Sequence, residues 1–254
     1  MIESPTAAVL LIGNEVLSGR TKDKNLGFIA DYLSALGIEL MEARVVADDE
    51  ADIVAAVNAL RARYTYVFST GGIGPTHDDI TADCMAKAFG VGISYHPEAV
   101  EILSAYFKEM GREANEARMR MARIPAGGTL IHNPISKAPG FRIGNVFVMA
   151  GVPKIMQTMM EELAPQLVKG AIAKSVTIEF QGGEGDVAKQ LGEIQKQYEA
   201  VTIGSYPFES PQGFATNLVL RSRDDVALEE AARQVERLSD DLLGQGKTRG
   251  WRRV

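Results

Sequence analysis

Three glycines and two aspartates are concentrated in one short segment, Ser69 to Thr81. The segment follows the apolar run 66–68, which is typical of a buried strand, and it precedes a helical pattern. Glycines permit a sharp turn and a close backbone approach to a ligand, and the next helix offers unpaired N–H groups with partial positive charge. The carboxylates of Asp78 and Asp79 would repel a bare phosphate, whereas a hard cation accepts carboxylate and phosphate oxygens together. The segment therefore indicates a site for a phosphorylated ligand with a divalent metal ion.

Two familiar phosphate-binding loops do not match this segment. Its G-G-x-G spacing differs from the G-x-G-x-x-G of dinucleotide-binding turns, and no Gly-Lys-Ser/Thr follows as in a Walker A loop. A purely geometric role for the glycines remains an alternative, although a plain turn needs only one or two of them.

Further candidates follow other strand patterns. Glu15, between Gly13 and Gly19, fits a metal ligand or a ligand-orienting carboxylate, and equally a surface acid. Asp48 follows the second strand and could reach the same cleft or cap the next helix. Lys137 offers a cation from a turn-rich loop, although a lone loop lysine is more often solvated. Gly151 precedes a helix that offers a second N-terminal anion site.

Strand and helix patterns alternate along the first two thirds of the chain. Strands are predicted over 7–12, 39–46, 65–69 and 146–149, and helices over 24–36, 52–62, 80–89, 96–123 and from 153 onward, with an irregular section over 125–144. This alternation predicts an α/β fold in three layers, with a mainly parallel sheet covered by helices on both faces. Ligands bind at the carboxyl ends of the strands in such folds, where the glycine-bearing loops lie.

A shift in composition near 168–171 predicts a domain boundary, with units 1–170 and 171–254. The second unit shows strands over 175–180, 201–206 and 215–221, helices over 186–198 and 228–243, and a turn-rich stretch over 207–213. The order β-α-β-β-α predicts a small α+β domain. The basic tail 247–253 is expected to be solvated and disordered.

Composition narrows the class of protein. With 254 residues, 46% hydrophobic and 24% charged, the chain is typical of a soluble globular protein. A net charge of −6 argues against general nucleic-acid binding. No apolar run approaches the roughly 18 residues of a membrane span, and the start of the chain does not read as a signal peptide. The single cysteine, Cys84, excludes an intrachain disulfide, so the cytoplasm is the default expectation.

The glycine–aspartate segment Thr70 to Thr81 resembles the signature of the molybdopterin-binding domain family of molybdenum-cofactor biosynthesis. Three further stretches agree in order: 13–19, 138–140 and 151–153. Within the family, the chain is most similar to the branch of the N-terminal region of competence/damage-inducible protein A and the hydrolase half of eukaryotic FAD synthase. The stretch 204–207 and the β-α-β-β-α unit fit that branch rather than the short adenylyltransferases.

The resemblance implies a crevice site and metal-dependent cleavage of a nucleotide diphosphate such as ADP-ribose or FAD, with a homo-oligomer (dimer or trimer) as the assembly. Catalysis is assigned to Asp79, Asp48 and Glu15, with Asp79 and Glu15 as ligands of Mg²⁺, Mn²⁺ or Co²⁺. Expected ligand-binding residues are Gly13, Asn14, Thr70, Gly71, Gly72, Gly74, Thr76, Thr81, Lys137, Gly140 and Gly151.

Two alternatives stay open. One is molybdopterin binding or adenylyl transfer in the same cleft. The other is a non-catalytic nucleotide-binding module, because Asn14 replaces the aspartate of the family's usual Gly-Asp-Glu and removes one potential metal carboxylate.

Overall fold

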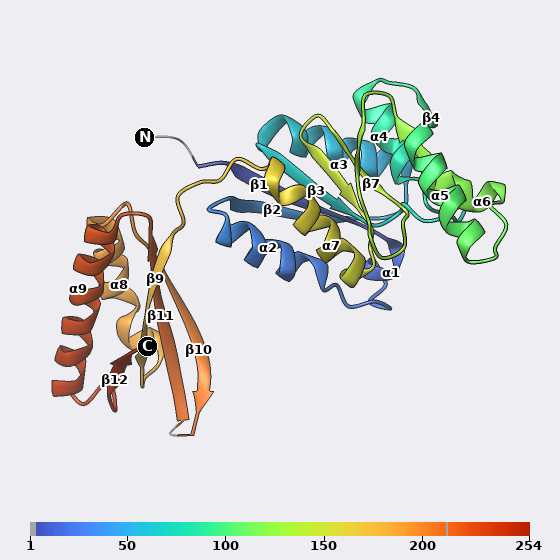
Figure 1. Cartoon of the computed structure of the whole chain (residues 1–254). Helices are drawn as coiled ribbons and strands as arrows, with labels where there is room; N and C mark the ends of the chain where they lie inside the picture. Colours follow the sequence, from blue (N-terminus) through green and yellow to red (C-terminus); the bar gives the residue numbers. More distant parts are fainter. Residues whose placement is uncertain (1–3, 212) are drawn as a thin grey trace. The chain divides into compact units, whose positions relative to one another are not determined.

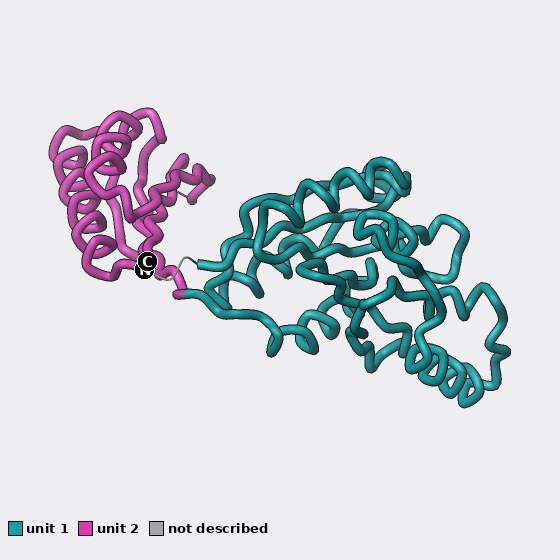
Figure 2. The backbone as a smooth tube through the Cα atoms, turned by 90° about the horizontal axis from the view of Figure 1, so that it is seen from above, with its two compact units in different colours: residues 1–170 teal, residues 171–254 magenta. Residues whose placement is uncertain are grey.

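A computed structural model describes residues 4–211 and 213–254. The chain divides into two compact units, residues 1–170 and 171–254, shown in teal and magenta in Figure 2. Each unit has its own sheet and its own core, and each is described by itself.

A six-stranded sheet forms the centre of the first unit. Its strand order is β2-β1-β3-β8-β7-β6; the pairings among the first four strands are parallel, and the β8–β7 and β7–β6 pairings are antiparallel. The bounds are β1 (Thr6–Ile12), β2 (Glu39–Val46), β3 (Tyr66–Thr70), β6 (Thr129–Ile131), β7 (Gly140–Ile143) and β8 (Val146–Met149). The predicted mainly parallel α/β sheet is confirmed.

Helices cover both faces of this sheet because its central strands are apolar on both sides. Along β1, Ala8, Leu10 and Ile12 pack toward α3 (Glu50–Arg63) and α4 (Thr81–Phe89). The alternate residues of β1 pack toward α2 (Asn25–Ala35) and α7 (Pro153–Leu163) on the opposite face. Figure 1 shows these two helical layers on either side of the sheet. The short helix α1 (Asn14–Leu17) follows β1 directly.

Local signals set the ends of these helices. The carboxylate of Asp49 accepts the amides of Ala51 and Asp52 and so caps the N-terminus of α3. Gly90 ends α4 in the left-handed region, at φ 65°. The capped N-terminus of α3 is also the end of the loop that follows β2 at the carboxyl edge of the sheet.

The helix predicted over 96–123 is wrong in extent. α5 (Pro97–Glu109) ends before Gly111, which has φ +63°, and Met110 at its end is 46% exposed. After it come α6 (Glu116–Met119) and a 3-10 turn, η1 (Arg120–Ala122). The antiparallel ribbon of β4 (Ile93–Tyr95) and β5 (Arg123–Pro125) flanks this segment.

The section 125–144, predicted to be irregular, contains β6 and β7. These strands have three and four residues, too few for a period of two to stand out from the surrounding glycines and prolines. Their antiparallel pairing extends the sheet past β8.

The second unit is an antiparallel sheet with two helices on one face. Its strand order is β10-β11-β9-β12. The bounds are β9 (Lys174–Phe180), α8 (Glu184–Gln197), β10 (Thr202–Ser210), β11 (Gly213–Ser222), α9 (Asp225–Gly244) and β12 (Trp251–Arg253). Ile178 and Leu218 of the sheet pack with Val187 of α8 and Val235 of α9. The predicted small α+β unit is confirmed.

The basic tail is ordered, contrary to the prediction, because its side chains contact acidic residues of the second unit. β12 pairs antiparallel with β9. The indole Nε1 of Trp251 donates to Asp240 at 2.8 Å, and Arg252 forms an ion pair with Glu179 at 2.7 Å. Arg253 forms another with Glu229 at 2.6 Å. These contacts fix a segment whose composition alone indicates disorder.

The stretch predicted to be turn-rich over 207–213 is mostly strand, and residue 212 lies outside the described residues. β10 continues through Pro207 to Ser210. Proline is tolerated there because β10 is an edge strand of the sheet, where one side of the backbone needs no partner.

In the described part of the chain, no helix combines the length and the apolar character needed to cross a bilayer.

Candidate functional site

Loops from β1, β3 and β8 meet around two glycines at the carboxyl edge of the first sheet. Gly71 and Gly72 have φ of +103° and +64°, which side-chain-bearing residues rarely adopt. A Cβ atom on Gly71 would lie 2.1 Å from the carbonyl oxygen of Ile12, at the end of β1. The amide of Gly71 donates to the carbonyl of Met149, at the end of β8, at 3.2 Å. Glycine is therefore required here for the three strand ends to approach one another.

Two buried polar side chains, those of Thr81 and Asn25, hold the loops after β3 and β8 in place through hydrogen bonds. The Thr81 hydroxyl donates to the carbonyl of Gly71 at 3.0 Å, and its amide donates to the carbonyl of Gly72 at 3.0 Å. Asn25, at the start of α2, donates through Nδ2 to the carbonyl of Gly151 at 2.9 Å. The loops after β3 and β8 are thereby tied to the first turns of α4 and α2.

Asp79 is held beside the glycine loop by Thr76. Its Oδ2 accepts the Thr76 amide at 2.8 Å and the Thr76 hydroxyl at 2.5 Å. A Cβ atom on Gly74 would lie 2.6 Å from the same oxygen, so glycine at this position makes room for the carboxylate. Oδ1 of Asp79 has no protein partner in the described part of the chain. This carboxylate therefore combines a fixed position with a free oxygen.

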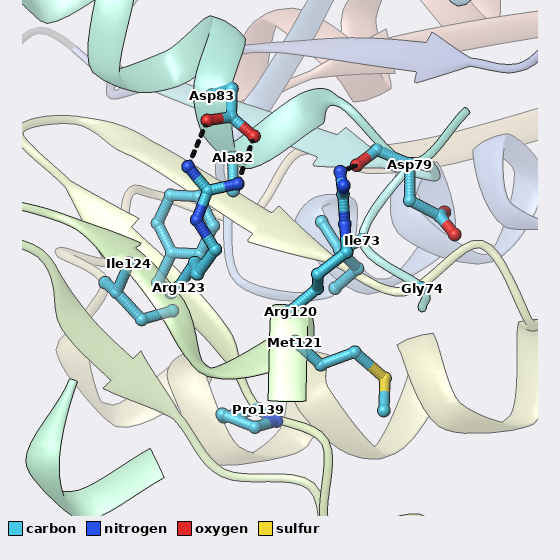
Figure 3. A pocket seen from close by; sticks show the side chains of 12 residues that line it. Ile73, Gly74, Asp79, Ala82, Asp83, Arg120, Met121, Arg123, Ile124 and Pro139 are labelled. Atoms are coloured by element: carbon cyan, nitrogen blue, oxygen red, sulfur yellow. Dashed lines mark hydrogen bonds and ion pairs between the residues drawn. The ribbon is translucent and has the colours of Figure 1, made fainter. Parts of the chain in front are cut away.

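The first of two hollows at this edge lies between the glycine loop and the segment that precedes β5 (Figure 3). We call it the Asp79 hollow. It is lined by Gly72, Ile73, Gly74, Asp79, Ala82, Asp83, Arg120, Met121, Arg123, Ile124, Pro139 and Phe141.

Two arginines line the Asp79 hollow, Arg120 from η1 and Arg123 from the start of β5. Arg123 pairs with both carboxylate oxygens of Asp83, at 2.9 and 2.7 Å. Arg120 donates to the backbone carbonyl of Asp79 at 3.4 Å (Figure 3). The hollow is thus lined by two arginines and by two carboxylates, of which Asp83 is paired with Arg123.

The second hollow lies on the other side of the loop, against the end of β1, and we call it the Glu15 hollow. It is lined by Leu11, Ile12, Glu15, Val16, Thr21, Lys22, Asp23, Lys24, Asn25, Thr70, Gly71, Gly151 and Pro153. The carboxylate of Glu15 folds back over Gly13, where a Cβ atom would lie within 2.8 Å of it.

The predicted site residues fall into three groups. Glu15, Thr70, Gly71 and Gly151 line the Glu15 hollow, and Gly72, Gly74 and Asp79 line the Asp79 hollow. Gly13, Asn14, Asp48, Thr76, Thr81, Lys137 and Gly140 line neither of them.

Several members of the third group have contacts that indicate a role in supporting the fold around the site. Asp48 Oδ2 accepts the amide of Asn14 at 2.8 Å and so caps α1. Lys137 is exposed, with φ +61°, in a loop closed by Asn133. A Cβ atom on Gly140 would lie 2.3 Å from the carbonyl of Val148, which places this glycine in strand packing.

Sequence reasoning missed the two arginines, Asp83 and Asn25. Arg120 and Arg123 lay within a predicted continuous helix, where charged residues indicate a solvated face. Asn25 lies in the first turn of a helical pattern, where its residue type alone does not indicate a role in the site. In each case, the contact partner is distant along the chain, so no local spacing marks it.

The donor chemistry of the Asp79 hollow suits a hard cation but does not complete its coordination. Among the described residues, no group of three or more histidine, cysteine, aspartate or glutamate side chains could hold a metal ion. Mg²⁺ is commonly held by one or two carboxylates together with water and substrate phosphates. A carboxylate with one free oxygen beside a glycine-rich loop fits that mode of binding.

Comparison with known proteins places the two units in known families. Residues 8–169 match the family model described as "Probable molybdopterin binding domain". Residues 173–243 match the model described as "FAD synthase, middle domain".

Full-length relatives agree with this assignment. A "CinA-like protein" from Citrifermentans bemidjiense is 35% identical over 255 residues, which cover 94% of this chain and 60% of that protein. A "Probable FAD synthase" from Caenorhabditis elegans is 30% identical, covering 94% of this chain and 50% of that protein. The chain thus spans only part of these two relatives.

A solved structure supports the fold of the first unit. The crystal structure of CinA, of unknown function, from Thermoplasma acidophilum aligns with a TM-score of 0.60 and 32% identity, covering 65% of this chain and 99% of that one.

Proposed function

Because the chain belongs to the molybdopterin-binding domain family, we propose that its first unit is a metal-dependent pyrophosphatase acting on a nucleotide diphosphate such as ADP-ribose or FAD. One observation carries the proposal: the glycine loop 71–74 lies at the carboxyl edge of the sheet, directly beside the fixed carboxylate of Asp79. Anion-binding and cation-binding groups meet there in one hollow.

The loop supplies the anion-binding groups. Within the described residues, the amides of Gly72, Ile73 and Gly74 meet no protein acceptor. Unpaired amides in a glycine-rich turn and the positive end of the following helix, α4, bind phosphate oxygens. They also stabilise negative charge that develops on the phosphate as its bridging bond breaks.

Asp79 supplies the complementary charge. Thr76 holds Oδ2, which leaves Oδ1 as the oxygen that would hold a divalent ion. When bound, such an ion lowers the pKa of a coordinated water and neutralises charge on the bridging oxygen. Addition of water across the phosphoanhydride then yields AMP and the second phosphate ester. Glu15, in the neighbouring hollow, orients the remainder of the ligand.

The direct test is release of AMP from ADP-ribose or FAD with Mg²⁺, Mn²⁺ or Co²⁺. We expect Asp79→Ala to lower kcat at least about a hundredfold, since it removes the carboxylate assigned to the metal. Asp31→Ala is the matched control, because that side chain is exposed on α2 and lines neither hollow. The absence of AMP with every metal would refute the proposal, and nucleotide binding without turnover would favour a non-catalytic module.

Molybdopterin binding or adenylyl transfer is the second candidate, favoured by the match of residues 8–169 to the molybdopterin-binding model. Anaerobic titration with molybdopterin separates the two. Micromolar binding that ADP-ribose fails to displace would favour the pterin.

We also propose a homo-oligomer, dimer or trimer. β2 is an edge strand of the first sheet, and its Met41 and Val45 are 53% and 41% exposed. Exposed apolar side chains on an unpaired edge are typical of an association surface. Light scattering during size exclusion gives the mass, and a monomer at micromolar concentration would contradict this proposal.

A further inference from the structure

Arg120 has a guanidinium group that is nearly unused by the protein. In the described part of the chain, its one hydrogen bond is that to the carbonyl of Asp79 at 3.4 Å, at the long limit for such a bond. No carboxylate of the described residues forms an ion pair with it. A partly buried guanidinium with so few hydrogen-bond partners in the protein can still bind an anionic ligand.

Arg123 provides the contrast within the same hollow. Both of its terminal nitrogens donate to Asp83, so its charge is neutralised and its fork is occupied (Figure 3). Arg123 therefore ties β5 to α4. Of these two arginines, Arg120 is the one available for a ligand.

The backbone under Arg120 is anchored. The following Ala122 is fully buried with Leu103 and Phe107 of α5, and the flanking Met119 and Met121 pack against the same cluster. The carbonyl of Ala122 also accepts the amide of His96 at 2.8 Å. The guanidinium is thus presented beside the glycine loop from an ordered support.

Groups that suit an anion converge on this hollow from two directions. Residues 72–74, whose amides have no protein acceptor among the described residues, line it from the loop, and Arg120 lines it from η1. A guanidinium binds phosphate oxygens in pairs through its planar fork. Asp79 contributes one negative charge, so a ligand rich in phosphate together with a divalent ion matches the charges better than a neutral ligand.

We propose that Arg120 binds a phosphate group of the diphosphate ligand directly, as the cation that the glycine loop itself lacks. The identity of the full ligand rests on the proposed function. The contact with a diphosphate does not, because the amides and the guanidinium would bind inorganic pyrophosphate as well.

The test uses the full chain and two measurements: calorimetric titration with inorganic pyrophosphate in the presence of Mg²⁺, and hydrolysis of ADP-ribose. We expect Arg120→Ala to weaken the Kd for pyrophosphate about tenfold to a hundredfold, the effect of losing charged hydrogen bonds. Arg120→Lys retains part of the affinity, since it keeps the charge and loses the fork. For ADP-ribose, the loss should appear chiefly in KM.

Arg112→Ala is the matched control, because Arg112 is an exposed arginine of the same connection and lines neither hollow. It removes one positive charge and should leave the Kd unchanged. Equal thermal midpoints of the variants would exclude unfolding as the cause.

The outcomes separate this inference from the proposed function. Pyrophosphate binding equal in wild type and Arg120→Ala, or no binding by wild type at millimolar ligand, overturns the inference. Loss of pyrophosphate binding in Arg120→Ala, with no AMP released by wild type, supports the Arg120 contact and refutes the hydrolase.

Discussion

At the scale of single residues, Gly71 has little tolerance for change. Its φ of +103° and the 2.1 Å approach of a Cβ atom to the Ile12 carbonyl allow no side chain without backbone movement. We predict that Gly71→Ala destabilises the first unit by at least about 2 kcal/mol and weakens pyrophosphate binding. Denaturant unfolding and calorimetry measure the two effects. An alanine variant with wild-type stability would mean that the loop conformation is not required.

Cys84 gives a second prediction, on alkaline stability. Burial raises the pKa of its thiol to about 11 from the ordinary 9.0. The folded state therefore holds this proton more tightly than the unfolded state does. The resulting stabilisation of the folded state is complete below about pH 9 and is lost as the pH rises toward about 11. Between these pH values, wild type should lose up to about 3 kcal/mol more of its unfolding free energy than Cys84→Ala.

Thiol labelling checks the same residue independently. At about pH 8, the native thiol should react with a disulfide reagent far more slowly than the denatured chain, because little thiolate is present and access is blocked. Rapid labelling of the native protein, or parallel pH profiles for wild type and variant, would contradict the prediction.

The residues of the site differ in how well the sequence could reveal them. Gly71, Gly72, Gly74 and Asp79 lie in one short segment, where backbone freedom and charge combine within a few positions. Arg120 contributes to the same hollow only after the chain has passed through α5 and α6. Because its partner is the backbone of Asp79, no side-chain pattern could indicate the contact.

At the scale of elements, Gly192 is a weak point inside α8. It is exposed, and a Cβ atom there would have no neighbour within 4 Å. Alanine loses less backbone entropy than glycine in a helix, so we predict that Gly192→Ala stabilises the second unit by about 1 kcal/mol. A rise in its thermal midpoint, with unchanged activity in the first unit, is the expected result. A lower midpoint would show that the site needs glycine for another reason.

Some strands were predictable from their own residues. β2 and β8 have the predicted bounds, although β8 is a continuous buried apolar run and β2 alternates exposed and half-buried residues. β12 was missed because its stability comes from Glu179, Glu229 and Asp240, which are distant in the sequence. A run of basic residues carries no information about whether such partners exist.

At the scale of the whole molecule, the set of strands in the first sheet could be predicted only in part, and their order was not predicted. Alternating helices and strands implied the parallel set β2, β1, β3 and β8. The antiparallel β7 and β6 required knowledge of two short strands that no periodicity marked. The loops of the site follow strands of the parallel part. The location of the site could therefore be predicted from the sequence, whereas the complete set of strands in the sheet could not.

The two units should also be separable. In the described residues, both core clusters of the large sheet lie between Ala7 and Leu167, whereas the third lies between Val176 and Trp251. The end of the first unit is secured internally, because the Val168 amide donates to the hydroxyl of Tyr66 at 2.9 Å and the Gly170 amide to the carbonyl of Leu36 at 3.0 Å.

We therefore predict that residues 1–170 fold alone and bind pyrophosphate with Mg²⁺ within about twofold of the full chain, since the residues of both hollows are all present. Calorimetry should show one of the unfolding transitions of the full chain at nearly the same temperature. If the fragment lacks a cooperative transition, stability of the first unit depends on residues 171–254. If it folds but loses the ligand, the second unit contributes directly to binding.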